Sequence, residues 1–129
     1  MGELLDFYKG MDLSFLQQCQ EEGMVLRDFD GAPRDPLQLA KECGVNAVRL
    51  RLWNSPEHGP ESGGYCSLPR TLEMGRKIKE AGLDFLLDFH YSDYWADPAQ
   101  QRKPKDWEGL SQEELACATS ACPPAASCP

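Results

Sequence analysis

The residues best suited to chemistry gather in one stretch, LDFLLDFHYSDYWADP, at positions 83–98. Its first half is an apolar run that contains Asp88 and His90, and its second half is rich in aromatic rings and carboxylates. A buried strand that opens at its carboxyl end into such groups is how α/β proteins build their sites. The stretch therefore predicts a buried strand that ends in a functional site.

Asp88 and His90 are two residues apart, so on a strand they share one face. Together they could bind a metal ion, orient another group, bind a substrate, or form a hydrogen-bonded pair in the core. The only other histidine, His58, falls in a loop, and the six cysteines form no CxxC pair. An orienting or substrate-binding role is therefore favoured, and neither a metal ion nor a cofactor is expected.

A second candidate group lies on the segment AVRLRLW at positions 47–53, which alternates strictly. Arg49, Arg51 and Trp53 occupy one face of the predicted strand. Arginines on a central strand require partners because a buried charge must be neutralised. An exposed edge strand with a solvated basic face is the alternative, but the surrounding Val, Leu and Trp residues favour burial. Asp12 lies near the carboxyl end of an earlier strand-like segment.

Aromatic side chains cluster at or just beyond the predicted strand ends, at Trp53, Tyr91, Tyr94 and Trp95. They could be core residues, but their polar flanks favour a binding platform for a carbohydrate. Aromatic faces stack on the C–H faces of sugars, and carboxylates and amides hydrogen-bond to sugar hydroxyls. Candidates for the polar contacts are Asn54, Asp93 and Asp97. The alternative for the two aspartates is loop capping, since Asp-Pro at Asp97 also opens turns.

These residues require a scaffold of parallel strands. We expect strands at 5–13, 47–53 and 84–90, a helix from Asp35-Pro36 to Gly44, and another from Pro69 to Gly82. Residues 17–31 are predicted to form a loop with at most one short pairing element. The helix ends and strand entries KECGVN (41–46) and KEAGLD (79–84) recur 38 residues apart. Repeated strand–helix units imply parallel strands with right-handed crossovers.

Two α/β architectures fit that repeat, a doubly wound sheet and a (β/α)8 barrel. A barrel takes roughly 250 residues, and this chain of 129 residues would hold less than half of one. Positions 1–115 carry the α/β pattern, with a capping box at Ser111 and Glu114. Positions 116–129 contain only Ala, Cys, Pro, Ser and Thr. We expect this tail to be an aberrant, disordered end, such as a frameshift produces, that cannot continue a helix.

Composition excludes several classes of function. The net charge of −8 argues against a nucleic-acid partner, which requires a basic face. No apolar run approaches the ~18 residues of a membrane span, so no membrane partner is expected. The amino terminus lacks the basic and long apolar regions of a signal peptide. As written, the sequence predicts a cytoplasmic protein, or an extracellular one if residues precede Met1.

Four motifs give the sequence a recognisable pattern: KGMDLS (9–14), VRLRLWNSP (48–56), LLDFHYSDYWADP (86–98) and QRKPKDW (101–107). In this order and at these spacings they resemble glycoside hydrolase family 53 over positions 7–107. The family comprises endo-β-1,4-galactanases, which hydrolyse the galactan side chains of pectin with retention. The resemblance implies an α/β fold, about the first three β/α units of a (β/α)8 barrel, and β-1,4-galactan as the partner.

By the same resemblance, the arginine-bearing strand helps to hold the carboxylate of the nucleophile, through either Arg49 or Arg51. Trp53, Asn54, His90 and Tyr91 are implied to line the substrate cleft. The family's two catalytic glutamates stand on the fourth and seventh strands, the first within an Asn-Glu pair. This sequence contains no Asn-Glu pair. No catalytic residue is therefore assigned, and the chain alone is expected to be inactive and poorly stable.

Two other functions remain open. One is a non-catalytic galactan-binding module that uses the aromatic cluster alone. The other is a metal-dependent hydrolase built on Asp88 and His90.

Overall fold

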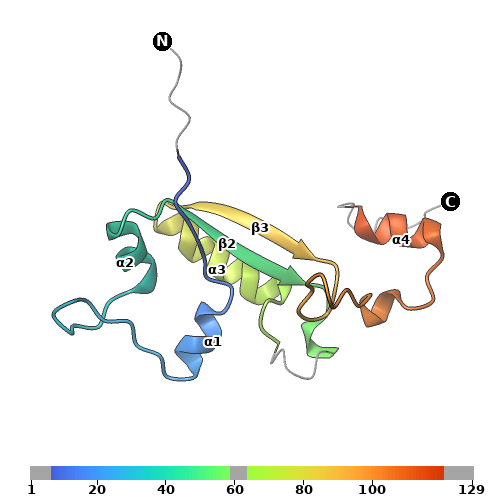
Figure 1. Cartoon of the computed structure of the whole chain (residues 1–129), viewed down its shortest axis with the longest axis horizontal. Coiled ribbons are helices and arrows are strands. Elements are labelled where there is room, and N and C mark those ends of the chain that lie inside the picture. The colour runs from blue at the N-terminus through green and yellow to red at the C-terminus, as the bar shows by residue number, and fades with distance from the viewer. Residues whose placement is uncertain (1–6, 59–63, 121–129) are drawn as a thin grey trace, which may run out of the picture.

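The structure, a computed structural model, describes residues 7–58 and 64–120. Three parallel strands form a sheet in chain order: β1 (Gly10–Asp12), β2 (Ala47–Trp53) and β3 (Asp84–His90). The helices are α1 (Leu16–Glu21), α2 (Pro36–Glu42), α3 (Leu68–Glu80) and α4 (Gln112–Thr119), and short 3₁₀ helices span Pro56–His58 and Lys105–Trp107. Helix α3 runs along one face of the sheet, and α4 lies beyond the carboxyl end of β3 (Figure 1).

The core lies between the sheet and the helices. Strand β2 contributes Val48 and Leu50, which are 0% and 2% exposed, and α3 contributes Met74 and Ile78. Further apolar residues complete this cluster: Leu16, Leu37, Ala81 and Leu83. Val48 and Leu50 face α3 because the strand alternates, which directs Arg49 and Arg51 to the other, inner face of the sheet. The core side of β2 therefore determines where its arginines point.

The helix start and stop signals of the sequence operate as expected. Asp35 accepts hydrogen bonds from the N–H groups of Leu37 and Gln38, both at 3.0 Å, ahead of Pro36 at the first helical position. Ser111 and Glu114 form the predicted capping box of α4. The starts of α2 and α4 are therefore encoded locally.

The two repeated turns have the same backbone conformation. Gly44 and Gly82 follow α2 and α3 with φ of 88° and 74°, a left-handed conformation that glycine adopts without strain. Lys41, at the end of α2, donates from Nζ to the carbonyl of Ala81 at 2.6 Å. The amide of Asp84 donates to Asn46 O at 2.8 Å, which joins the two strand entries. Consecutive units are therefore linked at equivalent positions.

The predicted strands agree with the structure except at β1. Residues 47–53 and 84–90 form β2 and β3 as expected. Strand β1 covers only three residues, 10–12, of the predicted 5–13, and positions 1–6 lie outside the described residues. The prediction that β3 is a buried strand is wrong. None of its residues is buried, because β3 pairs along one edge with β2 and no described segment pairs along the other.

Two expectations about helices also need correction. Most of helix α1 lies within residues 17–31, which were predicted to form a loop, and only its first residue, Leu16, is buried. The short pairing element allowed in that segment is present as the antiparallel bridge between Arg27 and Pro33. Helix α4 continues to Thr119, beyond the break expected at Ala116. Positions 121–129 lie outside the described residues.

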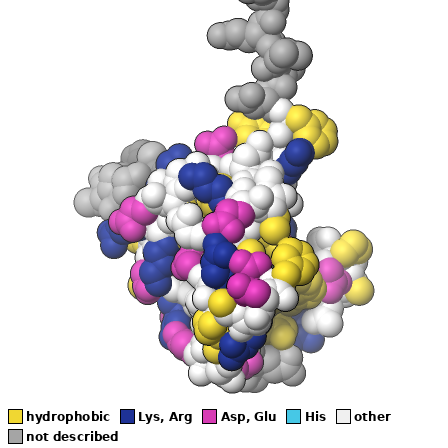
Figure 2. All heavy atoms as spheres, turned by 90° about the vertical axis from the view of Figure 1, so that its left-hand side faces the viewer, with side chains coloured by type: hydrophobic (Ala, Val, Ile, Leu, Met, Phe, Trp, Pro, Cys, Tyr) yellow, Lys and Arg dark blue, Asp and Glu magenta, His cyan; other side chains and the backbone are white. Residues whose placement is uncertain are grey.

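The surface carries both signs of charge. On the face shown in Figure 2, acidic and basic side chains are interspersed, with hydrophobic atoms between them. Within the described residues, no helix has the length and apolar character needed to cross a bilayer.

Candidate functional site at the carboxyl ends of the strands

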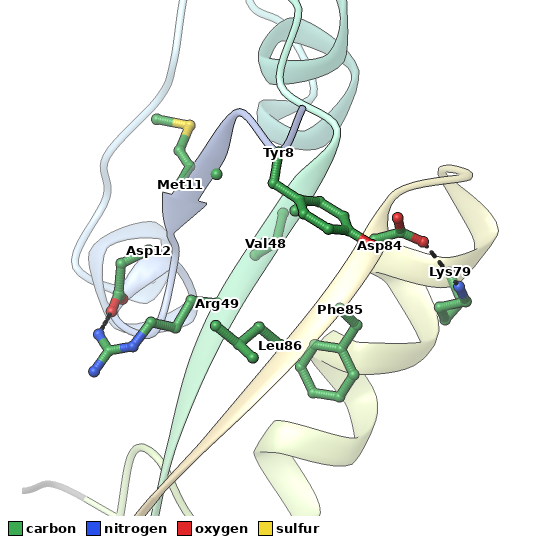
Figure 3. Close-up of a pocket in the computed structure, with 11 residues that line it drawn as sticks. Tyr8, Met11, Asp12, Val48, Arg49, Lys79, Asp84, Phe85 and Leu86 are labelled. Carbon is green, nitrogen blue, oxygen red and sulfur yellow. Dashed lines mark hydrogen bonds and ion pairs between the residues drawn. The ribbon is translucent and has the colours of Figure 1, made fainter. Parts of the chain in front are cut away.

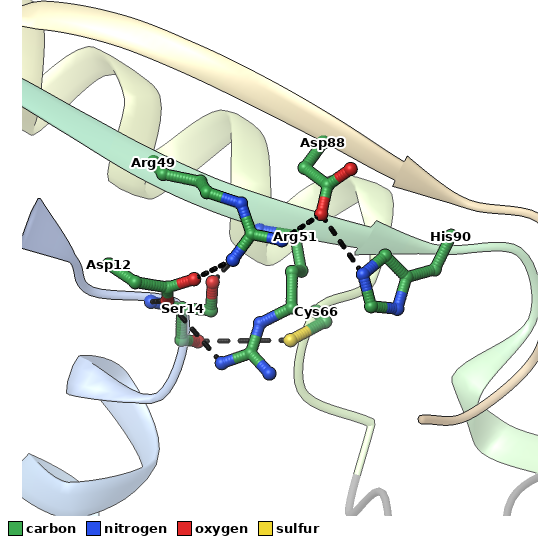
Figure 4. Close-up of polar contacts among 7 residues, drawn as sticks. All are labelled: Asp12, Ser14, Arg49, Arg51, Cys66, Asp88 and His90. Atoms are coloured by element: carbon green, nitrogen blue, oxygen red, sulfur yellow. Dashed lines mark hydrogen bonds and ion pairs between the residues drawn. The ribbon is translucent and has the colours of Figure 1, made fainter. Parts of the chain in front are cut away.

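A charged network crosses the inner face of the sheet from β1 to β3 (Figure 4). Arg49 on β2 forms ion pairs with Asp12 on β1 and with Asp88 on β3, through Nη1 and Nη2 respectively. Asp88 Oδ2 also lies 3.0 Å from Nε2 of His90. Because a carboxylate only accepts, Nε2 of His90 donates this hydrogen bond. One arginine therefore joins all three strands, and both of its Nη groups are occupied.

Arg51 lies on the same face but has a different environment. It is 6% exposed, and its one ion pair within the described residues joins Nη2 to Asp12 Oδ1 at 3.3 Å. Its guanidinium carbon lies 4.5 Å from the ring centroid of Phe15 and 4.4 Å from that of Trp95. No described residue accepts a hydrogen bond from its buried Nε or Nη1. Buried donors of a charged group are costly to leave unpaired, so these two are positioned to receive an acceptor.

The ion pairs affect the titration of Asp12. Partial burial raises the pKa of this carboxyl, but hydrogen bonds from Ser14, the charge of Arg51 and a hydrogen bond from Arg49 outweigh it, so the net pKa lies below the usual 3.8. Asp12 is therefore ionised at neutral pH. Nearby, burial raises the pKa of the Cys66 thiol to about 11. The thiol is protonated at neutral pH, and its contact with Ser14 O at 3.8 Å is structural.

The aromatic residues divide into an inner and an outer group. Trp95, 40% exposed, packs edge-on against His90 with ring centroids 6.1 Å apart. Trp53 is 1% exposed beneath Phe15 and Tyr94, so it supports the site from below. Among the predicted aromatic residues of the inner group, Trp95 is thus the exposed platform.

Tyr91 belongs to the outer group. It stacks on Phe89 and packs against Trp107, with centroid distances of 6.5 and 6.0 Å. Phe89 alternates with Asp88 and His90 along β3, so this group lies on the opposite side of the strand from the charged network.

The remaining predicted residues lie in the loops at the rim. Asn54 is exposed directly after β2. Asp93 accepts hydrogen bonds from the amides of Ser55 at 3.0 Å and Lys105 at 2.8 Å. Asp97 accepts from the amides of Ala99 at 2.7 Å and Gln100 at 3.0 Å, which is the loop-capping alternative raised from the sequence.

Sequence reasoning missed several residues that contribute to the site. Phe15 covers Arg51, and Ser14 Oγ accepts a hydrogen bond from the amide of Arg51 at 2.9 Å. Both follow Asp12 closely, Ser14 as the last residue of the motif KGMDLS and Phe15 directly after it, so their place after a strand end was the available signal. Trp107 is the last residue of the fourth motif, QRKPKDW, and packs on Tyr91. Its contact crosses a loop, which no local pattern indicates.

Two hollows flank the network. One of about 460 Å³ lies beside α1 and Trp95, with Phe15, Arg49 and Arg51 in its lining. The other, of about 790 Å³, lies over the amino-terminal halves of the strands between Tyr8, Met11, Leu86 and Asp84 (Figure 3). In (β/α)8 proteins the carboxyl ends carry chemistry and the amino ends carry stability. The smaller hollow is therefore the candidate for a ligand.

The electrostatics of the network disfavour a bound metal cation. The Arg49 guanidinium already lies between Asp12 and Asp88, and Asp88 Oδ2 also accepts from His90. A metal ion would have to displace these donors. In the part of the chain that the structure describes, no group of three or more His, Cys, Asp or Glu residues could hold a metal ion.

A parallel β/α sheet with charged and aromatic groups at the carboxyl ends of its strands is the arrangement of (β/α)8-barrel enzymes. Comparison with known families identifies the family of (β/α)8-barrel enzymes. The model for glycosyl hydrolase family 53 matches residues 8–120, and the chain belongs to this family. It has the α/β fold of part of that family's barrel.

Individual relatives support the assignment. An uncharacterized protein in the bgaB 5′ region of Niallia circulans is 52% identical over 109 residues, which are 84% of this chain and 28% of that protein. Endo-beta-1,4-galactanase of Bacillus subtilis is 39% identical over 111 residues, 84% of this chain and 26% of that enzyme. The solved GH53 catalytic domain of Ignisphaera aggregans superposes with a TM-score of 0.81 at 46% identity, covering 88% of this chain and 32% of that domain.

Proposed function

We propose that this chain forms the first part of the substrate cleft of an endo-β-1,4-galactanase and binds the galactan side chains of pectin there. The observation that carries the proposal is the exposed Trp95 ring beside His90 and the buried Arg51, at the carboxyl ends of the strands. Membership of family 53 and the named activity of the B. subtilis relative support the substrate.

The two carboxylates of the charged network do not supply the hydrolytic chemistry. A retaining glycosidase requires a nucleophile and an acid/base roughly 5–5.5 Å apart. Asp12 and Asp88 face each other across Arg49 and are both ion-paired to it. Neither is available for a covalent or proton-transfer step. We therefore expect the polypeptide of 129 residues to bind galactan without hydrolysing it.

Of the two arginines, Arg51 is the one we assign to the nucleophile's carboxylate. Both Nη groups of Arg49 are engaged, whereas Nε and Nη1 of the buried Arg51 have no partner among the described residues. Sodium acetate can serve as a stand-in for that carboxylate. Titrated into the chain, it should shift the side-chain N–H resonances of Arg51 more than those of Arg49. Equal shifts would contradict the assignment.

The function is tested by the binding and hydrolysis of β-1,4-galactotetraose. Isothermal titration calorimetry should detect saturable binding that weakens about tenfold or more in Trp95→Ala, since a stacked ring contributes more than a kilocalorie. Phe29→Ala is the matched control, because it also removes an aromatic ring. Phe29 is fully exposed and lies far from the site in the sequence. Release of reducing sugar above an empty-vector control would overturn the claim of binding without turnover. Unchanged binding in Trp95→Ala would overturn the site.

A metal-dependent hydrolase remains the weaker alternative, because Arg49 occupies the position between the carboxylates. Hydrolysis that disappears with a chelator and returns with a divalent cation would favour it.

A further inference from the structure

The loops that follow β2 and β3 continue side by side after the strands end. The last paired residues are Trp53 and His90. Beyond them, the amide of Asn54 donates to the carbonyl of Ser92 at 2.9 Å, and the amide of Ser55 donates to the Asp93 carboxylate at 3.0 Å. The Asp93 carboxylate thus takes the place of a main-chain carbonyl as the acceptor for the Ser55 N–H and extends the hydrogen bonding between the two parallel segments.

The same carboxylate holds a third segment. Asp93 Oδ2 accepts from the amide of Lys105 at 2.8 Å, at the start of the 3₁₀ helix Lys105–Trp107. A second bond joins the outer two segments directly, because Ser55 Oγ donates to Asp106 Oδ2 at 2.7 Å. The prolines that adjoin these bonds, Pro56 and Pro104, are fully buried and anchor both segments.

We infer that Asp93 is a positioning residue that fixes Asn54 at the rim of the cleft, rather than a group that binds the sugar. The inference rests on the proposed function, in which the rim faces galactan. Each Asp93 oxygen already accepts a backbone N–H from a different segment, and a carboxylate used in this way holds its neighbours in a fixed geometry. Asn54, directly before Ser55, is exposed, and its side-chain amide lies 3.3 Å from Ser55 Oγ. Fixing Ser55 therefore fixes the asparagine.

Amide hydrogen exchange of the ligand-free chain, followed by NMR, tests the loop linkage. In Asp93→Ala the amides of Ser55 and Lys105 should exchange about tenfold faster or more, as expected for the loss of a charge-assisted hydrogen bond. The Leu50 amide within β2 should keep its protection. Asp93→Asn, which retains one acceptor oxygen, should accelerate only one of the two amides and serves if the alanine variant fails to fold. Unchanged exchange at Ser55 and Lys105 would overturn the inference.

Asp97→Ala is the matched control for the exchange measurement. Its carboxylate lies in the same loop, and among the described residues it accepts only from the amides of Ala99 and Gln100 within that loop. The variant should accelerate those two amides and leave Ser55 and Lys105 as in the parent. Acceleration at Ser55 in this control would show that the loop responds as a whole and would contradict a specific role for Asp93.

A double-mutant cycle distinguishes positioning from direct contact. Asp93→Ala and Asn54→Ala should each weaken binding of β-1,4-galactotetraose about tenfold, and the double variant should bind no more weakly than Asn54→Ala alone. Additive losses would mean that Asp93 contacts the sugar itself and would overturn the inference. If the parent chain does not bind the tetrasaccharide, the proposed function fails, while the exchange result still decides whether Asp93 holds the loops.

Discussion

Strands β2 and β3 follow nearly identical helix ends and turns, and each contains seven residues, yet their burial differs sharply. Four residues of β2 are buried, including both Val48 and Leu50, whereas β3 has none. The difference comes from neighbours, because β2 is paired on both edges and β3 on one. An apolar alternating segment thus specifies a strand, while the segments around it determine how much of that strand is buried.

The largest expected effect comes from truncating one leucine in each strand, Leu50 on the helix-facing side of β2 and Leu86 on the opposite side of β3. Leu50→Ala removes a side chain that is 2% exposed and should lower the free energy of unfolding by about 2–5 kcal/mol. Leu86→Ala removes one that is 59% exposed and should cost under about 1 kcal/mol. Urea denaturation measures both. Equal losses would mean that β3 is as well covered in solution as β2.

A smaller effect is expected at the repeated turns. Gly82→Ala and Gly44→Ala should each destabilise the chain by about 1 kcal/mol, since both glycines have positive φ. Gly82→Ala should cost more, because a Cβ there would lie 3.1 Å from Lys41 Nζ, against 4.0 Å from Lys9 Nζ at Gly44. Gly23→Ala provides a control for backbone strain alone, with no atom within 4 Å. If Gly44→Ala lowers the midpoint of thermal unfolding more than Gly82→Ala does, the expected clash with Lys41 Nζ is contradicted.

The smallest effect concerns pH and the link between β1 and β2. The pKa of Asp12 lies below 3.8 in the folded chain, so its ionised form stabilises the fold. This stabilisation is fully present above pH 3.8 and is lost as the pH falls through the lowered folded pKa. Asp12→Asn should therefore be less stable than the parent at neutral pH, and its unfolding free energy should fall less steeply in acid. If the free energy of unfolding depends on pH in the same way in both proteins, the role of this ion pair is contradicted.

The sequence predicted the elements that carry their own local signals. Strand alternation defined β2 to the residue, an apolar run defined β3, and Asp35-Pro36 and Ser111 marked helix starts that the structure confirms. Helix α1 was missed because it has six residues, one buried side chain and no side-chain cap. Its conformation depends on the packing of Leu16 into the core rather than on an amphipathic pattern of its own.

The site was predictable in its location but not in the division of roles. Alternation placed Arg49 and Arg51 on one face, yet only the register of three strands decides that Arg49 is paired on both sides and Arg51 is not. Trp53 and Trp95 were equally plausible platforms by type. Phe15 contacts both rings, but Tyr94 packs on Trp53, a contact that joins segments distant in the chain. Such contacts leave no trace in local spacing.

The order of the strands in the sheet is also the order of their synthesis. Each strand pairs with the one translated immediately before it, and the Lys41 bond to Ala81 can form once α3 has emerged from the ribosome. Chains emerge from the ribosome at about 5–20 residues per second, amino terminus first. The layer of β1, β2 and α3 can therefore assemble before β3 has been translated in full. Strand β3 then adds to an existing template, and no segment has to wait for a distant partner.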